Sequence, residues 1–170
     1  MGEFVRDKDA VMSCVMIAEA AAWAKEQGKT LYELLADIYV KYGFFKEKLI
    51  SLTKKGKDGQ EQIKAMMKAF RSTPPHSIAG SDIVLIHDYL SSETIDLISD
   101  LRYIIPLPAS DVLQLVTHDN TMVSVRPSGT EPKIKFYIGV RHELNAKEDF
   151  EKVAELVDTK IEAVIKDLKL

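Results

Sequence analysis

The chain has 170 residues and a formal net charge of −3 at pH 7, so its length suits one domain, or one domain with an additional fragment. The slightly acidic balance provides no overall basicity to attract nucleic acid, and no apolar run reaches the roughly 18 residues that a membrane-spanning helix requires. Its single cysteine, Cys14, cannot form an internal disulfide and is expected to be a small core residue. With no signal-peptide pattern at the start, these features predict a cytoplasmic protein.

The first 43 residues predict two helices. Residues 10 to 27 form an apolar run with Asp7 or Asp9 as N-cap and Gly28 beyond its end. Because this helix is apolar on nearly every side, we expect it to be buried on several of them. Residues 30 to 33 read as a capping box that opens a second helix, which we expect to end near Gly43.

Residues 44 to 170 alternate between strand and helix patterns. Apolar stripes at helical spacing predict helices from about residue 60 to 72 and from 150 to 168. The predicted strands are 46–53, 83–86, 112–117, 121–125 and 133–141, with residues 90–108 as an irregular excursion. This order predicts an α+β fold: an antiparallel sheet of four to five strands with two helices on one face.

The segment between the last two predicted strands is rich in anion donors. It supplies a guanidinium, two hydroxyls, a glycine that lets the backbone bend, and an ammonium group on the following strand. These groups belong to Arg126, Ser128, Thr130, Gly129 and Lys135, respectively. Pro127 and Pro132 restrict the backbone on both sides of the turn. The combination suits binding of a phosphate dianion through charge-assisted hydrogen bonds; the alternative is an ordinary turn with solvated charges.

This stretch, Arg-Pro-Ser-Gly-Thr-Glu-Pro-Lys-Ile-Lys-Phe-Tyr, resembles the phosphate-binding loop in the C-terminal domain of the phosphohexomutases, the phosphoglucomutases and phosphomannomutases. Residues 4–11 resemble the end of the family's third domain, and residues 39–73 its passage into the fourth. The resemblance implies a helical remnant of the sugar-binding third domain at 1–43 and the C-terminal phosphate-binding domain at 44–170. It also implies that Lys8 points into the active cleft; the alternative is a solvated lysine before a helix.

For the complete enzyme the resemblance implies transfer of a phosphoryl group between the 1- and 6-positions of a phosphosugar, through a bisphosphate intermediate, with Mg²⁺ and a hexose 1,6-bisphosphate activator. The predicted role of this part is to hold the phosphate that is not transferred, through the loop residues and Lys135, where many relatives carry Arg. Nothing in the chain matches the family's phosphoserine, its aspartate-rich metal loop or its sugar-binding Glu-x-Ser loop. We therefore expect no catalytic residue, metal or cofactor site in this chain, which should be inactive without the remaining domains. The missing sugar loop leaves the choice among glucose, mannose and pentose phosphates open.

Two other functions fit the residues less well. The chain could be a stand-alone phospholigand-binding module without catalysis, or a nucleic-acid or protein interaction module that uses the basic segment 46–71. A solvated face is the favoured interpretation of that segment, because aromatic side chains do not alternate with its charges. The four histidines have no metal-ligand spacing and are expected at the surface or in turns. Finally, the apolar helices predict self-association through residues 10–42, or local disorder there.

Overall fold

The structure, a computed structural model, describes residues 8–54, 56 and 58–170. Two helices open the chain, α1 (Ala10–Glu26) and α2 (Leu31–Tyr42). The Asp9 side chain caps α1 by accepting a hydrogen bond from the Met12 amide at 2.9 Å, while Asp7 lies outside the described residues. The capping box of Thr30 and Glu33 is confirmed at the start of α2, and Gly43, with φ of 100°, ends it.

The rest of the chain builds an antiparallel sheet with two long helices. In the described part of the chain the sheet has eight strands, in the order β1-β8-β7-β6-β3-β4-β5, with β2 paired to β3. The strands are β1 (Phe44–Thr53), β2 (Ser77–Ile78), β3 (Ser81–Asp88), β4 (Glu93–Asp96), β5 (Arg102–Ile104), β6 (Leu113–Thr117), β7 (Met122–Pro127) and β8 (Lys133–His142). The helices are α3 (Gly59–Ser72) and α4 (Phe150–Asp167), with a short 3₁₀ turn, η1 (Lys147–Asp149), before α4.

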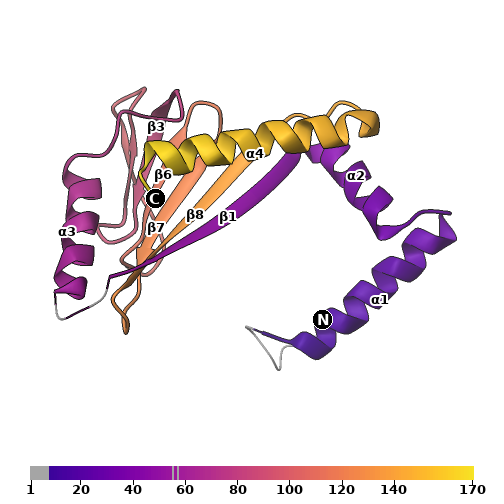
Figure 1. The fold of residues 1–170 in the computed structure, drawn as a ribbon, viewed down its shortest axis with the longest axis horizontal. Helices are drawn as coiled ribbons and strands as arrows, with labels where there is room; N and C mark the ends of the chain where they lie inside the picture. Colours follow the sequence, from indigo (N-terminus) through magenta and orange to yellow (C-terminus); the bar gives the residue numbers. More distant parts are fainter. Residues whose placement is uncertain (1–7, 55, 57) are drawn as a thin grey trace.

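Both long helices cover the same face of the sheet, and α4 runs across it in Figure 1. Alternate residues of β7 and β8 point toward these helices and are fully buried, among them Val125 and Phe136. The Phe70 ring of α3 meets the Phe136 ring at 5.8 Å between centroids, and Val157 and Val164 of α4 join the same core. The opposite face of β1, β8 and β7, called here the open face, is not covered by α3 or α4. The α+β class and the placement of two helices on one face are therefore confirmed.

The predicted strand count of four to five is wrong. The excursion at 90–108 contains β4 and β5, which add to the sheet edge beyond β3. These strands are only four and three residues long, and the turns around them place Ser92 and Asp100 at positive φ. Such short strands between polar turn residues carry too little alternation for a period-two pattern to be recognised.

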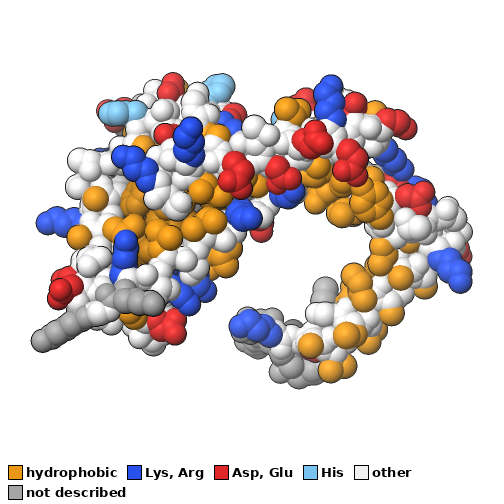
Figure 2. All heavy atoms as spheres, in the orientation of Figure 1, with side chains coloured by type: hydrophobic (Ala, Val, Ile, Leu, Met, Phe, Trp, Pro, Cys, Tyr) orange, Lys and Arg blue, Asp and Glu red, His pale blue; other side chains and the backbone are white. Residues whose placement is uncertain are grey.

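Helix α1 stands away from the sheet, whereas α2 lies beside the start of β1 (Figure 1). Helix α2 packs on the start of α4 and of β1 through rings of Tyr39, Phe44 and Phe150, with Tyr39 and Phe44 centroids 4.6 Å apart. Helix α1 packs against α2, and Ala24 is the residue of α1 that becomes fully buried. Figure 2 shows hydrophobic atoms along α1 and over α2, facing the hollow between the pair and the sheet.

The expected burial of the first helix is therefore wrong in this structure. Val11, Val15 and Ile17 of α1 are 78%, 57% and 62% exposed, and Cys14 is exposed rather than a core residue. The physical reason is that no element in the described part of the chain covers these sides of α1. The origin of residues 1–43 as a remnant of a third domain stays a prediction. No helix in the described part of the chain is long and apolar enough to cross a membrane.

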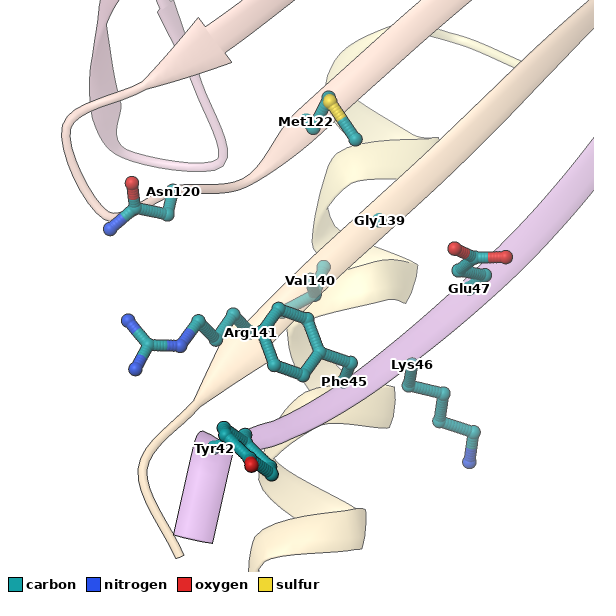
Figure 3. A pocket seen from close by; sticks show the side chains of 9 residues that line it. All are labelled: Tyr42, Phe45, Lys46, Glu47, Asn120, Met122, Gly139, Val140 and Arg141. Carbon is teal, nitrogen blue, oxygen red and sulfur yellow. The ribbon is translucent and has the colours of Figure 1, made fainter. Parts of the chain in front are cut away.

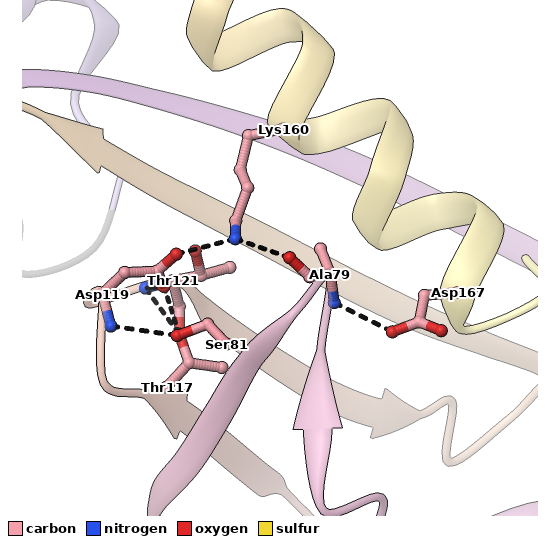
Figure 4. A network of polar contacts seen from close by, with 7 residues as sticks. All are labelled: Ala79, Ser81, Thr117, Asp119, Thr121, Lys160 and Asp167. Carbon is pink, nitrogen blue, oxygen red and sulfur yellow. Dashed lines mark hydrogen bonds and ion pairs between the residues drawn. The ribbon is translucent and has the colours of Figure 1, made fainter.

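A polar network ties α4 to two turns of the sheet (Figure 4). The Lys160 ammonium donates to the Ala79 carbonyl at 3.0 Å and forms an ion pair with Asp119 at 2.7 Å, while Asp167 accepts from the Ala79 amide at 2.8 Å. Burial raises the pKa of Asp119, but hydrogen bonds from Lys160, Thr117 and Thr121 outweigh that effect and hold its pKa well below the ordinary range. The network therefore fixes the β6–β7 turn beneath α4.

Candidate functional site

The predicted phosphate loop joins β7 to β8 and is closed by its own backbone. The Ser128 amide donates to the Lys133 carbonyl at 2.7 Å, and the Lys133 amide donates to the Glu131 carbonyl at 2.7 Å. The Lys54 amide, just beyond β1, donates to the Pro132 carbonyl at 2.9 Å. The loop is therefore held both at its base and by the neighbouring strand.

The start of α3 approaches this anchor closely. A Cβ atom placed on Gly59 would lie 2.3 Å from the Lys54 carbonyl oxygen and 3.2 Å from Cβ of Pro132. Only glycine leaves room for this approach. The sequence pattern gave no sign that Gly59 packs beside the loop.

Arg126 and Lys135 are paired directly across β7 and β8, so both side chains leave the sheet on its open face. Neither forms an ion pair with a carboxylate among the described residues, whereas the nearby Lys133 ammonium pairs with Glu131 at 3.5 Å. Two cations lying side by side without a carboxylate are suited to a divalent anion. The guanidinium can bind two oxygens at once, while the ammonium acts as a point charge.

The hydroxyl of Ser128 organises the tip of the loop. Its oxygen accepts long hydrogen bonds from the Thr130 amide at 3.4 Å and the Glu131 amide at 3.3 Å. These two amides point toward the same place, and the Ser128 proton remains available to an acceptor. Gly129 does not have a left-handed φ, and a Cβ atom there would meet nothing within 4 Å. The structure thus gives no conformational reason for glycine at this position. Because glycine has no side chain, however, the space above the loop stays open.

These groups surround one pocket of about 260 Å³. Its lining consists of Arg126, Pro127, Ser128, Gly129, Thr130, Lys135 and Tyr137. All five predicted binding residues are therefore brought together. Tyr137 is the residue that sequence reasoning missed as a site residue, although its place two residues after Lys135 puts it on the same face of the strand.

Lys8 is not brought to this pocket. It is exposed, lies two residues before α1, and does not belong to the pocket lining. The N-terminal end of α1 and the β7–β8 loop are far apart in Figure 1. A cleft role for Lys8 stays a prediction.

A second hollow of about 340 Å³ lies at the other end of the open face, where α2 meets β1 (Figure 3). The side chains of Tyr42, Phe45 and Arg141 gather at one end of it, with the Arg141 guanidinium 5.7 Å from the centre of the Phe45 ring. Gly43 permits this arrangement, because a Cβ atom there would lie 2.8 Å from Nε of Arg141. Arg141 is thus held on an aromatic ring rather than presented at the loop.

Three cations of the basic segment 46–71 have carboxylate partners. Lys46 pairs with Asp158 at 2.7 Å, Lys64 with Glu61 at 2.8 Å, and Arg71 with Asp88 at 3.1 Å and Asp111 at 2.6 Å. Because these cations are neutralised by different carboxylates, the favoured interpretation as a solvated face gains support.

The described residues contain no group of three or more side chains suited to hold a metal ion. One expectation for the histidines is wrong: His87 lies half-buried on β3, where its Nδ1 is 2.7 Å from Oγ1 of Thr94. Burial lowers the pKa of this imidazole.

Comparison with known proteins finds relatives of this chain by sequence. No protein-family profile matches the chain. It is 43% identical over 138 residues to a phosphoglucomutase of Staphylococcus aureus strain bovine RF122 / ET3-1, covering 81% of this chain and 25% of that protein. It is 40% identical over 158 residues to the phosphoglucomutase of strain MRSA252, covering 93% and 28%.

Among solved structures, parafusin, a phosphoglucomutase from Paramecium in its open form, aligns with a TM-score of 0.49 and 12% identity over 96% of this chain and 29% of that one. The chain thus spans about a quarter of the length of the curated relatives, and the identity of 40–43% to them carries the assignment. Over the region that it shares with them, the chain is homologous to phosphoglucomutases.

Proposed function

We propose that this chain is the phosphate-binding part of a phosphoglucomutase, in which the β7–β8 loop holds one phosphate of a hexose phosphate. The observation that supports the proposal best is the pair Arg126 and Lys135. These two cations lie side by side on the open face, beside the loop amides, without a carboxylate partner among the described residues. The names of the relatives favour glucose phosphates as substrate.

In the proposed mechanism the chain positions a phosphate rather than transferring it. Arg126 donates two hydrogen bonds in a fork, Lys135 adds charge, and the hydroxyls of Ser128 and Thr130 complete the contacts, with open space above Gly129. Holding whichever phosphate is not in transfer lets the bisphosphate intermediate turn around and react at its other end. Positioning and electrostatics are the main contributions a protein makes to phosphoryl transfer.

For the complete enzyme we propose transfer between the 1- and 6-positions with Mg²⁺ and a hexose 1,6-bisphosphate, in the cytoplasm. We assign neither the metal nor the activator to residues of this chain. The remaining domains of the complete enzyme would supply the nucleophile, the metal loop and the sugar-reading loop.

The proposal is tested by titrating the ¹⁵N-labelled chain with inorganic phosphate. One loop holding one phosphate supports a millimolar dissociation constant, about −4 kcal/mol. We expect amide shifts at residues 126–135. Arg126→Ala should weaken binding at least about tenfold, because hydrogen bonds to charged groups contribute roughly 1.5–3 kcal/mol each.

The matched control is Arg141→Ala, which removes an arginine from the same face of the sheet, on the neighbouring strand β8 and about 20 Å along it from Lys135. It should leave the affinity unchanged. Shifts confined to residues 46–71, or equal losses in the two variants, would show that the loop is not the site.

A further inference from the structure

The open face continues the loop pocket into a second, less polar pocket, and this inference rests on the phosphate site proposed above. Antiparallel pairing of β7 and β8 sets Arg126 opposite Lys135, then Ser124 opposite Tyr137, then Met122 opposite Gly139. Successive rows on one face of a sheet are about 7 Å apart. The row of Ser124 and Tyr137 is therefore the first one that a group attached to a bound phosphate would reach along the sheet.

The hydroxyl of Ser124 is oriented by a neighbour. Nε2 of Gln114 donates to Oγ of Ser124 at 2.9 Å, and Gln114 is paired with Ser124 across β6 and β7. Because the serine oxygen already accepts this bond, its own proton is the one offered to a ligand. The Tyr137 hydroxyl makes no hydrogen bond within the described residues, and the side chain is 41% exposed.

Around these hydroxyls the surface is hollow and mainly apolar, although Glu47 and Lys48 of β1 also belong to the lining. A pocket of about 350 Å³ adjoins the loop pocket through Tyr137, which lines both. Leu49 of β1 lies beside Tyr137 in register and is 50% exposed, while Met122 and Gly139 line the next row, as labelled in Figure 3. Since Gly139 has no side chain, the pocket remains open at this row.

An aromatic ring, an aliphatic side chain and two hydroxyls beside a phosphate site match one class of ligand group. A sugar ring has an apolar C–H face that packs on an aromatic ring and hydroxyls around its edge that pair with hydroxyl donors. We propose that Ser124 and Tyr137 form a sugar subsite, so that the chain itself binds a phosphosugar more tightly than it binds phosphate. This subsite would position the sugar from the phosphate side, in addition to contacts from other domains.

The experiment compares inorganic phosphate with glucose 6-phosphate on the full chain, using amide shifts to measure both dissociation constants. We expect glucose 6-phosphate to bind about 3- to 10-fold more tightly, the gain from one or two neutral hydrogen bonds. Tyr137→Ala should abolish that preference, so that glucose 6-phosphate and phosphate bind with the same dissociation constant. Ser124→Ala and Tyr137→Phe should each remove part of it, because each deletes one hydroxyl.

Tyr103→Ala is the matched control: Tyr103 is 50% exposed on β5, at the far edge of the sheet, and its loss should change neither constant. Equal binding of both ligands by the unmodified chain would overturn the sugar subsite and leave the phosphate loop intact. An equal loss for both ligands in Tyr137→Ala would also overturn it. If phosphate itself produces no shifts at 126–135, the proposed function fails and this inference with it. Should Tyr137→Ala not fold, the ratio measured on Ser124→Ala and Tyr137→Phe decides.

Discussion

Replacing Lys160 by methionine should destabilise the domain that carries the loop. The Lys160 ammonium joins α4 to the Asp119 carboxylate and to the Ala79 carbonyl, as Figure 4 shows. Ala79 has a φ of 49°, which is unusual for a residue with a side chain, and both of its backbone polar groups are held from α4. Methionine keeps most of the apolar length of lysine and removes the charge and the donors.

The expected loss of unfolding free energy depends on how far the two paired side chains are exposed to solvent. The Lys160 side chain is 24% exposed and the Asp119 side chain 42%. A hydrogen bond to a charged group contributes roughly 1.5–3 kcal/mol, and solvent around Asp119 reduces its pair with Lys160 to about 1 kcal/mol. Together with the lost bond to the Ala79 carbonyl, we expect unfolding to become easier by about 2 kcal/mol. For a chain of this size that corresponds to a melting temperature about 5 °C lower.

Urea unfolding followed by far-UV circular dichroism is the appropriate measurement. The only tryptophan, Trp23, lies in α1, so fluorescence would report on the helical pair rather than on the sheet. Lys152→Met on the same helix is the control, since Lys152 is exposed and has no ion-pair partner among the described residues. If the two variants lose the same free energy within about 0.5 kcal/mol, the ordinary range for surface changes, the reasoning is refuted.

Three further outcomes are expected. The pKa of Asp119 is lowered in the folded chain, so this carboxylate stabilises the fold above its unfolded pKa of about 4, and the stabilisation is lost as the pH falls toward the folded value. When unfolding is measured at decreasing pH, Asp119→Asn should therefore lose less stability below pH 4 than the unmodified chain. The 170-residue chain should not convert glucose 1-phosphate to glucose 6-phosphate with Mg²⁺ and a trace of glucose 1,6-bisphosphate, and turnover in the usual range of about 1–10³ s⁻¹ would contradict this. The chain should self-associate through residues 10–42 as concentration rises in light scattering; Ile17→Asp should reduce this, while Ile104→Asp, at a position 85% exposed on β5, should not.

Local rules were sufficient for elements whose ends and periodicity are encoded within a few residues. The sequence predicted three such features correctly, because each depends on neighbours in sequence: the capping box at Thr30 and Glu33, the alternation along β8 and the apolar stripe of α4. The sequence did not predict the strands β4 and β5, because segments of three or four residues adopt strand geometry here only by pairing with β3 and with each other. The exposure of Cys14 could not be read either, since burial depends on what packs against a helix.

The sequence likewise predicted some residues of the candidate site and not others. The residues of the loop were recognisable because they are contiguous, and Lys135 follows from alternation along a strand. Tyr137 lines the pocket through the same alternation, but an isolated tyrosine does not by itself indicate a site. The contact of Gly59 with Lys54 and Pro132, and the orientation of Ser124 by Gln114, join segments distant in sequence and required the fold.

The charges of the open face favour binding over stability. Several other cations of this domain have carboxylate partners, as Lys46 has Asp158 and Lys160 has Asp119. Arg126 and Lys135, by contrast, lie directly opposite each other on neighbouring strands, an arrangement in which like charges destabilise a sheet. A departure from local stability of this kind is expected at functional sites. One phosphate dianion between the two side chains would turn their repulsion into attraction, so binding and folding should be coupled: phosphate should raise the free energy of unfolding as its concentration passes the dissociation constant.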